Sequence, residues 1–145
     1  MQFLSHKEAG VYLQTFLFGQ LRSSSNYDDS DDRDVVGTNG VGSALTNVFS
    51  SKYIITSADK KKQFYGEWAN NMREVKEPKI TSCKDHFTET KFLLDYDKFD
   101  EDVDSYITDD FVSIIEKRCI DAAAANQGLE INFSYTDNGK TIDIS

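Results

Sequence analysis

The spacing of apolar and polar residues predicts where helices and loops begin along the first third of the chain. Residues 7–21 have the apolar period of a helix. Residues 22–34 are polar, lack any such period and predict a long loop. Residues 36–50 pass from a glycine-rich turn into a second apolar-periodic segment. The first helix offers these side chains for burial: Val11, Phe16, Leu17 and Leu21.

The middle of the chain changes to the alternating pattern that is typical of strands. A short strand is predicted at residues 53–55, and residues 59–62 are predicted to turn the chain. Apolar and polar residues then alternate over 63–72 and again over 87–96. These segments predict a run of about three strands.

The last third predicts one helix followed by a hairpin. Thr108 is an N-cap residue followed by two aspartates, and Gly128 is placed to end the helix. Apolar residues alternate over 129–135, and residues 137–139, Asp-Asn-Gly, are typical of a hairpin turn. The predicted fold class is α+β, with helices packed on one face of a mostly antiparallel mixed sheet.

Length and composition support a single folded domain over residues 1–145. Hydrophobic residues make up 39% of the 145, which is enough for a core. No long apolar run and no signal peptide is present, so we expect a soluble, intracellular protein without membrane contact. Cys83, Cys119, His6 and His86 have no metal-ligand spacing, so the sequence predicts no metal site of that kind.

The net charge of −9 is concentrated in two segments. Residues 28–34 carry a net charge of −4 and residues 95–110 a net charge of −7. A protein that grips a nucleic-acid backbone by itself is expected to have a basic surface, so these runs argue against that role. Solvated loops explain both runs better than metal binding does.

The glycine-rich turn before the second predicted helix is the main candidate for a binding site. Gly37, Gly40 and Gly42 leave little side-chain bulk, and backbone N–H groups of such a turn, with those of the helix that follows, suit a phosphate. The segment is not a Walker loop, because no Gly-Lys-Ser/Thr follows the glycines. It is not a dinucleotide fingerprint either, because the glycines do not have the G-x-G-x-x-G spacing. An ordinary turn is the alternative interpretation.

Several separated motifs together resemble the ATPase region of type IIA DNA topoisomerases. They are Ser-Ser-Asn-Tyr-Asp-Asp at 24–29, Gly-Thr-Asn-Gly-Val-Gly-Ser at 37–43, Leu-Thr-Asn-Val-Phe-Ser at 45–50 and Trp-Ala-Asn-Asn-Met at 68–72. The resemblance covers nearly the whole chain. It implies the GHKL (Bergerat) nucleotide-binding sandwich, and an enzyme that passes one DNA duplex through another while hydrolysing ATP.

The resemblance implies a role for each segment of a partial ATPase domain. The lid would lie at about residues 22–36, the phosphate loop at 37–43, and the late sheet and helix at 52–145. Thr88 matches the threonine that lies near the adenine in this family. Thr90 takes its place if the register of the strand is shifted by two residues. Without the resemblance, loop capping is the preferred explanation of Ser24, Ser25 and Asn26, and β-propensity is the alternative explanation of the strand threonine. The implied ATP-binding residues are Ser24, Ser25, Asn26, Asn39, Gly40, Val41, Gly42, Ser43 and Thr88.

The sequence also departs from the family pattern. Thr38 and Ala44 stand where eukaryotic members usually carry Arg and Lys, which favours a phage or viral source. No residue matches the Glu that activates water or the Asn that holds Mg²⁺, so the chain is predicted to supply no catalytic residue and no metal ligand. The chain alone should therefore release no phosphate from ATP above background, because general-base assistance contributes about 10²–10⁴-fold.

The partners implied are the remaining segments or subunits of a homodimeric topoisomerase, with DNA bound by the holoenzyme rather than by this acidic piece. Such an enzyme would act in the cytoplasm of a bacterial or phage-infected host, or in the nucleus of a eukaryote. The alternative is a non-catalytic acidic interaction protein that derives from a topoisomerase or targets one. The missing catalytic residues favour this alternative, whereas the three loop glycines favour the ATPase.

Overall fold

The computed structural model describes residues 5–6, 11–21, 40–99, 107–137 and 140–144. The chain forms two compact units, Met1–Phe99 and Asp100–Ser145. The first unit contains β1 Ser5–His6, β2 Val11–Tyr12, α1 Leu13–Gly19, α2 Gly42–Val48, β3 Ser50–Asp59, β4 Lys62–Ala69, β5 Glu74–Val75, β6 Lys79–Ser82, β7 His86–Leu94 and a 3-10 helix at Tyr96–Lys98.

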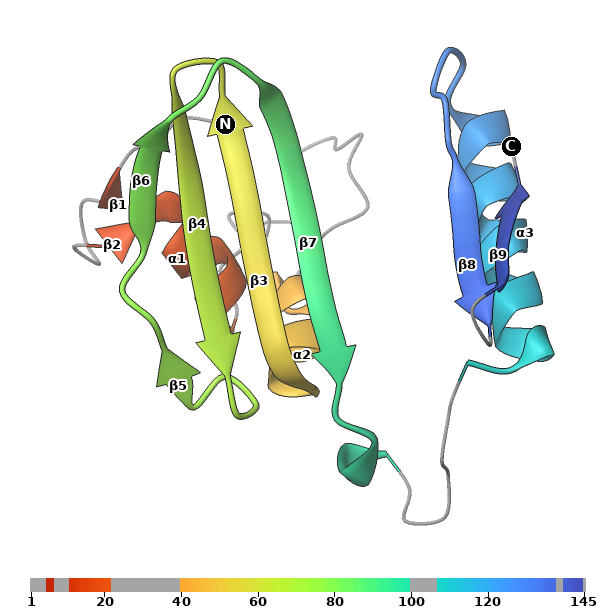
Figure 1. Cartoon of the computed structure of the whole chain (residues 1–145), viewed down its shortest axis with the longest axis horizontal. Coiled ribbons are helices and arrows are strands. Elements are labelled where there is room, and N and C mark those ends of the chain that lie inside the picture. The colour runs from red at the N-terminus through yellow and green to blue at the C-terminus, as the bar shows by residue number, and fades with distance from the viewer. Residues whose placement is uncertain (1–4, 7–10, 22–39, 100–106, 138–139, 145) are drawn as a thin grey trace, which may run out of the picture. The chain divides into compact units, whose positions relative to one another are not determined.

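A five-stranded sheet forms the body of the first unit. Its order is β5-β4-β3-β7, with β6 also paired to β4, and every pair that the structure describes is antiparallel. Helices α1 and α2 lie against one face of this sheet (Figure 1). The α+β fold class with helices on an antiparallel sheet is confirmed.

The core lies between this sheet face and the helices. Alternation along β3 and β4 turns Tyr53, Ile55, Phe64 and Trp68 toward the helices, where all four are buried. The rings of Tyr53 and Trp68 meet edge to face with centroids 6.0 Å apart. These partly buried side chains pack around the four: Phe18, Met72 and Ile80.

Gly19 at the end of α1 allows the helix to approach the core closely. A Cβ atom at this position would lie 2.9 Å from Nε1 of Trp68 and 3.1 Å from its Cζ2. Both distances are tighter than ordinary van der Waals contact, so only glycine lets α1 pack directly on the indole.

The turn between β3 and β4 has the structure that its sequence predicts. One carboxylate oxygen of Asp59 accepts hydrogen bonds from the backbone N–H groups of Lys61 and Lys62, at 3.0 and 2.9 Å. The bond from Lys62 is the main reason why the pKa of Asp59 is lowered. Lys60 takes a positive φ of 72°, which the turn requires.

Other elements differ from their predicted bounds. The helix predicted over residues 7–21 is limited to Leu13–Gly19, and Val11 belongs to a short strand instead. The strand predicted to reach Met72 ends at Ala69, because the next three residues adopt left-handed backbone conformations. Strands β5 and β6 were not predicted, since two and four mostly polar residues carry no measurable alternation.

The second unit consists of α3 Asp109–Ala125 and the hairpin of β8 Phe133–Asp137 with β9 Lys140–Ile144. The side chain of Thr108 accepts a hydrogen bond from the N–H of Phe111 at 3.2 Å, which confirms the predicted N-cap. Gly128 has a φ of 85°, which suits the predicted helix stop. Strand β8 begins four residues later than the predicted alternation. No helix in the described part of the chain is long and apolar enough to cross a bilayer.

The sheet face opposite the helices carries a buried carboxylate. Glu67 on β4 is 7% exposed. Its side chain accepts hydrogen bonds from the Tyr65 hydroxyl at 2.6 Å and from Nζ of Lys76 at 2.7 Å, while Nζ of Lys52 lies 3.5 Å away. The bonds from Lys76 and Tyr65 lower the pKa of Glu67 to about 2.

We expect this cluster to make the stability of the first unit dependent on acid pH. Because the pKa of Glu67 is lowered from 4.5 to about 2 on folding, its contribution is complete above pH 4.5 and is lost as the pH falls toward 2. Lowering the pH from about 5 to about 3 should therefore reduce the free energy of unfolding less in Glu67→Gln than in the unmodified chain. Urea unfolding at the two pH values measures this difference. Equal losses would contradict the assignment.

Candidate phosphate-binding site

The turn into α2 presents backbone donors that no side chain of the helix cap uses. Gly40 has a φ of 60°, and the N-cap residue Val41 makes no side-chain cap hydrogen bond. The first intrahelical bond runs from the N–H of Leu45 to the carbonyl of Val41 at 2.8 Å. The N–H groups of the preceding helical residues therefore have no acceptor within the helix. The first turn also lacks an acidic residue that would compete for them.

Gly42 opens the space in front of these donors. It is exposed, and of the described residues beyond its chain neighbours and its own helix, none has an atom within 4 Å of the position that a Cβ would take. A ligand group can therefore approach the backbone at this point. Donors at the positive end of a helix dipole with open space in front of them suit a phosphate oxygen.

Two side chains attach α2 to α1. The hydroxyl of Ser43 donates to the carbonyl of Leu17 at 3.3 Å, and Nδ2 of Asn47 donates to the carbonyl of Phe18 at 3.2 Å. Because its hydroxyl is already used, Ser43 has its backbone N–H to offer a ligand. That the phosphate loop acts mainly through backbone groups stays a prediction.

Thr88 and Thr90 both lie on β7, on the face that carries the helices. They are paired in register with Ser57 and Ile55. The side chain of Thr90 is hydrogen-bonded to Tyr53. Burial raises the pKa of Tyr53, and this bond offsets only part of the increase. Thr88 and Thr90 are both exposed. The two alternatives differ in that the side chain of Thr90 is engaged with Tyr53.

The described residues include only part of the predicted site. Gly40, Val41, Gly42 and Ser43 lie together at the start of α2. The predicted lid, residues 22–36, lies outside the described residues. So do these predicted site residues: Ser24, Ser25, Asn26 and Asn39.

Buried polar atoms near the α1–α2 contact were not predicted. Gln14 and Asn47 are fully buried, and both amide atoms of Gln14 and Oδ1 of Asn47 lack a hydrogen-bond partner in the described structure. The hydroxyl oxygen of Thr15 is also buried and lacks a hydrogen-bond partner among the described residues. Gln14 and Thr15 interrupt the apolar residues of α1, and this interruption is the only trace of the buried polar atoms in the sequence of that helix.

We expect Gln14→Met to raise the free energy of unfolding by about 1–3 kcal/mol, because it replaces an unsatisfied buried amide with an apolar chain of similar length. Chemical denaturation measures the change. Gln20→Met, at an exposed position directly after α1, is the control and should shift stability by less than about 0.5 kcal/mol. A loss of stability in the Gln14 variant would show that the amide has a partner that this structure lacks.

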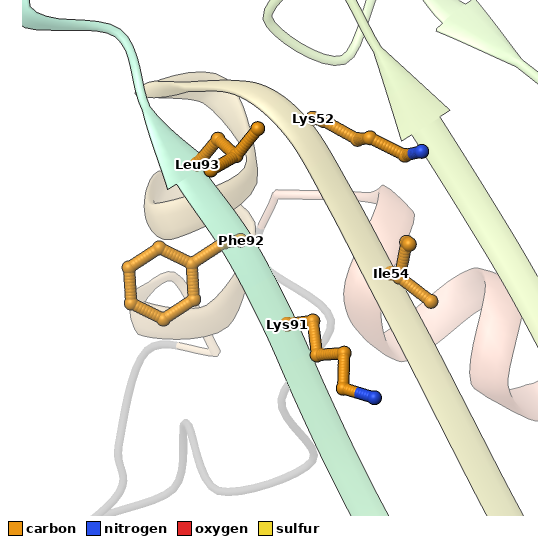
Figure 2. A pocket seen from close by; sticks show the side chains of 5 residues that line it. All are labelled: Lys52, Ile54, Lys91, Phe92 and Leu93. Carbon is orange, nitrogen blue, oxygen red and sulfur yellow. The ribbon is translucent and has the colours of Figure 1, made fainter. Parts of the chain in front are cut away.

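A shallow pocket lies on the sheet face that carries Glu67. It has a volume of about 110 Å³ and is lined by Lys52, Ile54, Lys91, Phe92 and Leu93. Figure 2 shows the ring of Phe92 pointing to the other side of β7 from Lys91. Small-molecule sites usually measure about 300–1,000 Å³, so this pocket does not suit a nucleotide.

The described residues show no metal centre. Among them, no three His, Cys, Asp or Glu side chains gather as they would around a metal ion.

Comparison with known proteins finds related sequences over nearly the whole chain. No protein-family model matches. DNA topoisomerase 2 of Bombyx mori is 36% identical over 97% of this chain, and that of Arabidopsis thaliana is 37% identical over 96%. DNA topoisomerase 2 of Invertebrate iridescent virus 6 is 35% identical over 90%. The chain spans 9%, 9% and 12% of these relatives, respectively.

Solved structures agree with the sequences. The ATPase region of Saccharomyces cerevisiae topoisomerase II bound to ICRF-187 matches 99% of this chain with a TM-score of 0.79 and 29% identity. The ATPase and transducer domains of topoisomerase II from Balamuthia mandrillaris match 88% with a TM-score of 0.79 and 33% identity. The chain covers 37% and 34% of those two structures. In sequence and in fold, the chain therefore corresponds to a part of the ATPase region of type II DNA topoisomerases.

Proposed function

We propose that this chain supplies the phosphate-binding part of the ATPase domain of an ATP-hydrolysing type II DNA topoisomerase, an isomerase that changes DNA topology by duplex passage. The observation that carries the proposal is the match, in both sequence and fold, of almost the entire chain to ATPase regions of topoisomerase II. The open, uncapped start of α2 supports it independently.

In this function the start of α2 would hold the phosphates of ATP. The N–H groups of Gly42 and Ser43 would donate to phosphate oxygens, and the helix end would add a partial positive charge of about half an elementary charge. Thr38 and Ala44 are neutral, so backbone donors would carry more of the binding than in a loop with basic side chains. Thr88 would lie on the adenine side.

The rest of the enzyme would supply what this chain lacks. The base that activates water and the Mg²⁺ ligand are proposed to come from other segments or subunits, as is the surface that binds DNA. A homodimeric holoenzyme is part of this proposal. Its source is proposed to be viral, with support from the iridescent virus relative. Relatives from an insect and a plant match at a similar level of identity.

The proposal is tested by nucleotide binding to the complete enzyme that contains this chain. Titration calorimetry with a non-hydrolysable ATP analogue and Mg²⁺ should show saturable binding, and inorganic tripolyphosphate should compete, since backbone donors recognise the phosphates. A protein that binds neither compound would contradict the proposal.

The second candidate function is a non-catalytic acidic interaction protein that derives from a topoisomerase or targets one. The concentrated acidic charge of residues 28–34 and 95–110 favours it. Stable binding to a DNA topoisomerase, together with no nucleotide binding, would identify this function. Nucleotide binding that tripolyphosphate displaces would reject it.

A further inference from the structure

The turn after β4 holds three consecutive residues in left-handed backbone conformations. Asn70, Asn71 and Met72 have φ angles of 51°, 56° and 66°. Such angles are unfavourable for residues other than glycine, and least so for asparagine. Conformations of this kind persist when surrounding contacts enforce them, and they gather at functional sites. The contacts that hold this turn in place therefore indicate what it is for.

The turn is hydrogen-bonded to the segment that follows α2. The N–H of Asn71 donates to the carbonyl of Ser50 at 3.1 Å, and the N–H of Asn70 donates to the carbonyl of Ser51 at 3.0 Å. The left-handed conformation is what directs these consecutive N–H groups at consecutive carbonyls. Ser50 is buried, and its hydroxyl donates to the carbonyl of Thr46 in the last turn of α2 at 2.6 Å.

Asp95, just after β7, completes the arrangement. Its N–H donates to the carbonyl of Phe49 at 2.9 Å, and its carboxylate accepts a hydrogen bond from Nδ2 of Asn71 at 2.9 Å. Asn71 and Asp95 thus bind each other through their side chains, and they bind the carbonyls of Phe49 and Ser50 through their backbone. We call this pair, with its two carbonyl partners, the Asn71–Asp95 clamp.

The clamp fixes the end of α2 that is remote from the phosphate loop. Helix α2 has seven residues, so its two ends are only about 10 Å apart at 1.5 Å per residue. Ser43 and Asn47 attach the helix to α1, and the clamp is the second attachment. A short rigid helix held in this way transmits any shift at Phe49 and Ser50 to the donors at Gly42.

We infer that Asn71 and Asp95 are positioning residues for nucleotide binding, which orient the start of α2 by holding its far end. This inference rests on the proposed function, because it concerns the same phosphate site. Neither side chain touches the ligand in this role. The hydrogen bond between them is the element that ties the turn after β4 to the segment after β7, across the end of α2.

The turn itself offers a matched control. Asn70 also has a left-handed φ, and its Nδ2 also donates to a carboxylate, that of Glu74, at 3.3 Å. That bond is exposed and makes no link to Asp95. Asn71→Gly and Asn70→Gly both keep the backbone N–H and suit the positive φ, so they differ mainly in which side-chain bond is lost.

The experiment measures the affinity of the complete enzyme that contains this chain for a non-hydrolysable ATP analogue with Mg²⁺. Asn71→Gly should weaken binding about tenfold, since a hydrogen bond to a charged group is lost from the support of the site, whereas Asn70→Gly should leave binding unchanged. The double variant Asn71→Asp with Asp95→Asn reverses donor and acceptor and should restore the affinity. Hydrogen exchange of residues 42–49 should be faster in Asn71→Gly alone.

The outcomes separate the inference from the function on which it rests. If the unmodified protein binds no analogue, the proposed function fails and the positioning role fails with it. If the unmodified protein binds but the two glycine variants behave alike, the positioning role is wrong and the proposed function stands. The same holds if the double variant binds no better than Asn71→Gly while it remains folded, as judged by its thermal transition.

Discussion

Replacing Trp68 with alanine should lower the free energy of unfolding by about 3–5 kcal/mol, which is typical of a large aromatic side chain removed from a core. The indole is 2% exposed, packs edge to face on Tyr53 and lies directly under Gly19. The loss would therefore remove contacts from β3 and from α1 together. Denaturant unfolding followed by circular dichroism measures the change.

The matched control for this prediction is Val75→Ala. Val75 on β5 is the register partner of Trp68 on the neighbouring strand, but it is 57% exposed. Its truncation should change stability by less than about 0.5 kcal/mol. Similar losses for the two variants would mean that Trp68 does not form the centre of the core.

Replacing Gly42 with aspartate should change stability and nucleotide binding in opposite directions. A carboxylate in the first turn of a helix favours the helix by about 0.3–1 kcal/mol. The same charge about 4 Å from a phosphate repels it by about 1–4 kcal/mol at effective dielectric constants of roughly 80 to 20. We therefore expect a slightly higher melting temperature and an affinity for the ATP analogue that is lower by roughly tenfold or more.

Gly42→Ala separates charge from bulk in this experiment. Among the described residues outside this helix, none has an atom within 4 Å of the new Cβ, and alanine favours a helix over glycine, so the variant should fold at least as well. It should lose less affinity than the aspartate variant because it adds no charge. Unchanged nucleotide binding in Gly42→Asp would contradict the placement of phosphate at this end of α2.

Local chemistry made some elements of the fold predictable. Thr108 and Gly128 mark the limits of α3 because a hydroxyl cap and a positive φ are local requirements. The β3–β4 turn follows from Asp59, whose carboxylate needs only its own neighbours. The alternation of Phe64 and Trp68 showed which face of β4 is buried.

Elements that depend on distant contacts were missed or misplaced. Helix α1 is shorter than its apolar period because the residues before it pair as β1 and β2. The left-handed turn at Asn70 and Asn71 depends on carbonyls of another strand, which local propensity cannot reveal. The full burial of Gln14 likewise results from packing that brings α1 against α2 and β4.

The candidate site was partly predictable for the same reason. Glycines at 40 and 42 directly before an apolar-periodic segment indicate an open helix start, and the structure has one. The clamp at Asn71 and Asp95 could not be predicted, since the two residues are 24 positions apart and meet only in the folded sheet. The motif that contains Asn71 was recognised only as a resemblance.

The close approach of Gly19 to Trp68 has a consequence for how this protein can vary in evolution. The Cβ atom of any side chain at position 19 would lie 2.9 Å from Nε1 of Trp68, which is closer than non-bonded Cβ contacts in proteins normally are. A larger residue there requires a smaller one at position 68, or else α1 moves and carries with it the carbonyls of Leu17 and Phe18 that hold α2. Positions 19 and 68 should therefore covary among related sequences, although one belongs to the helix that supports the phosphate loop and the other to the core of the sheet.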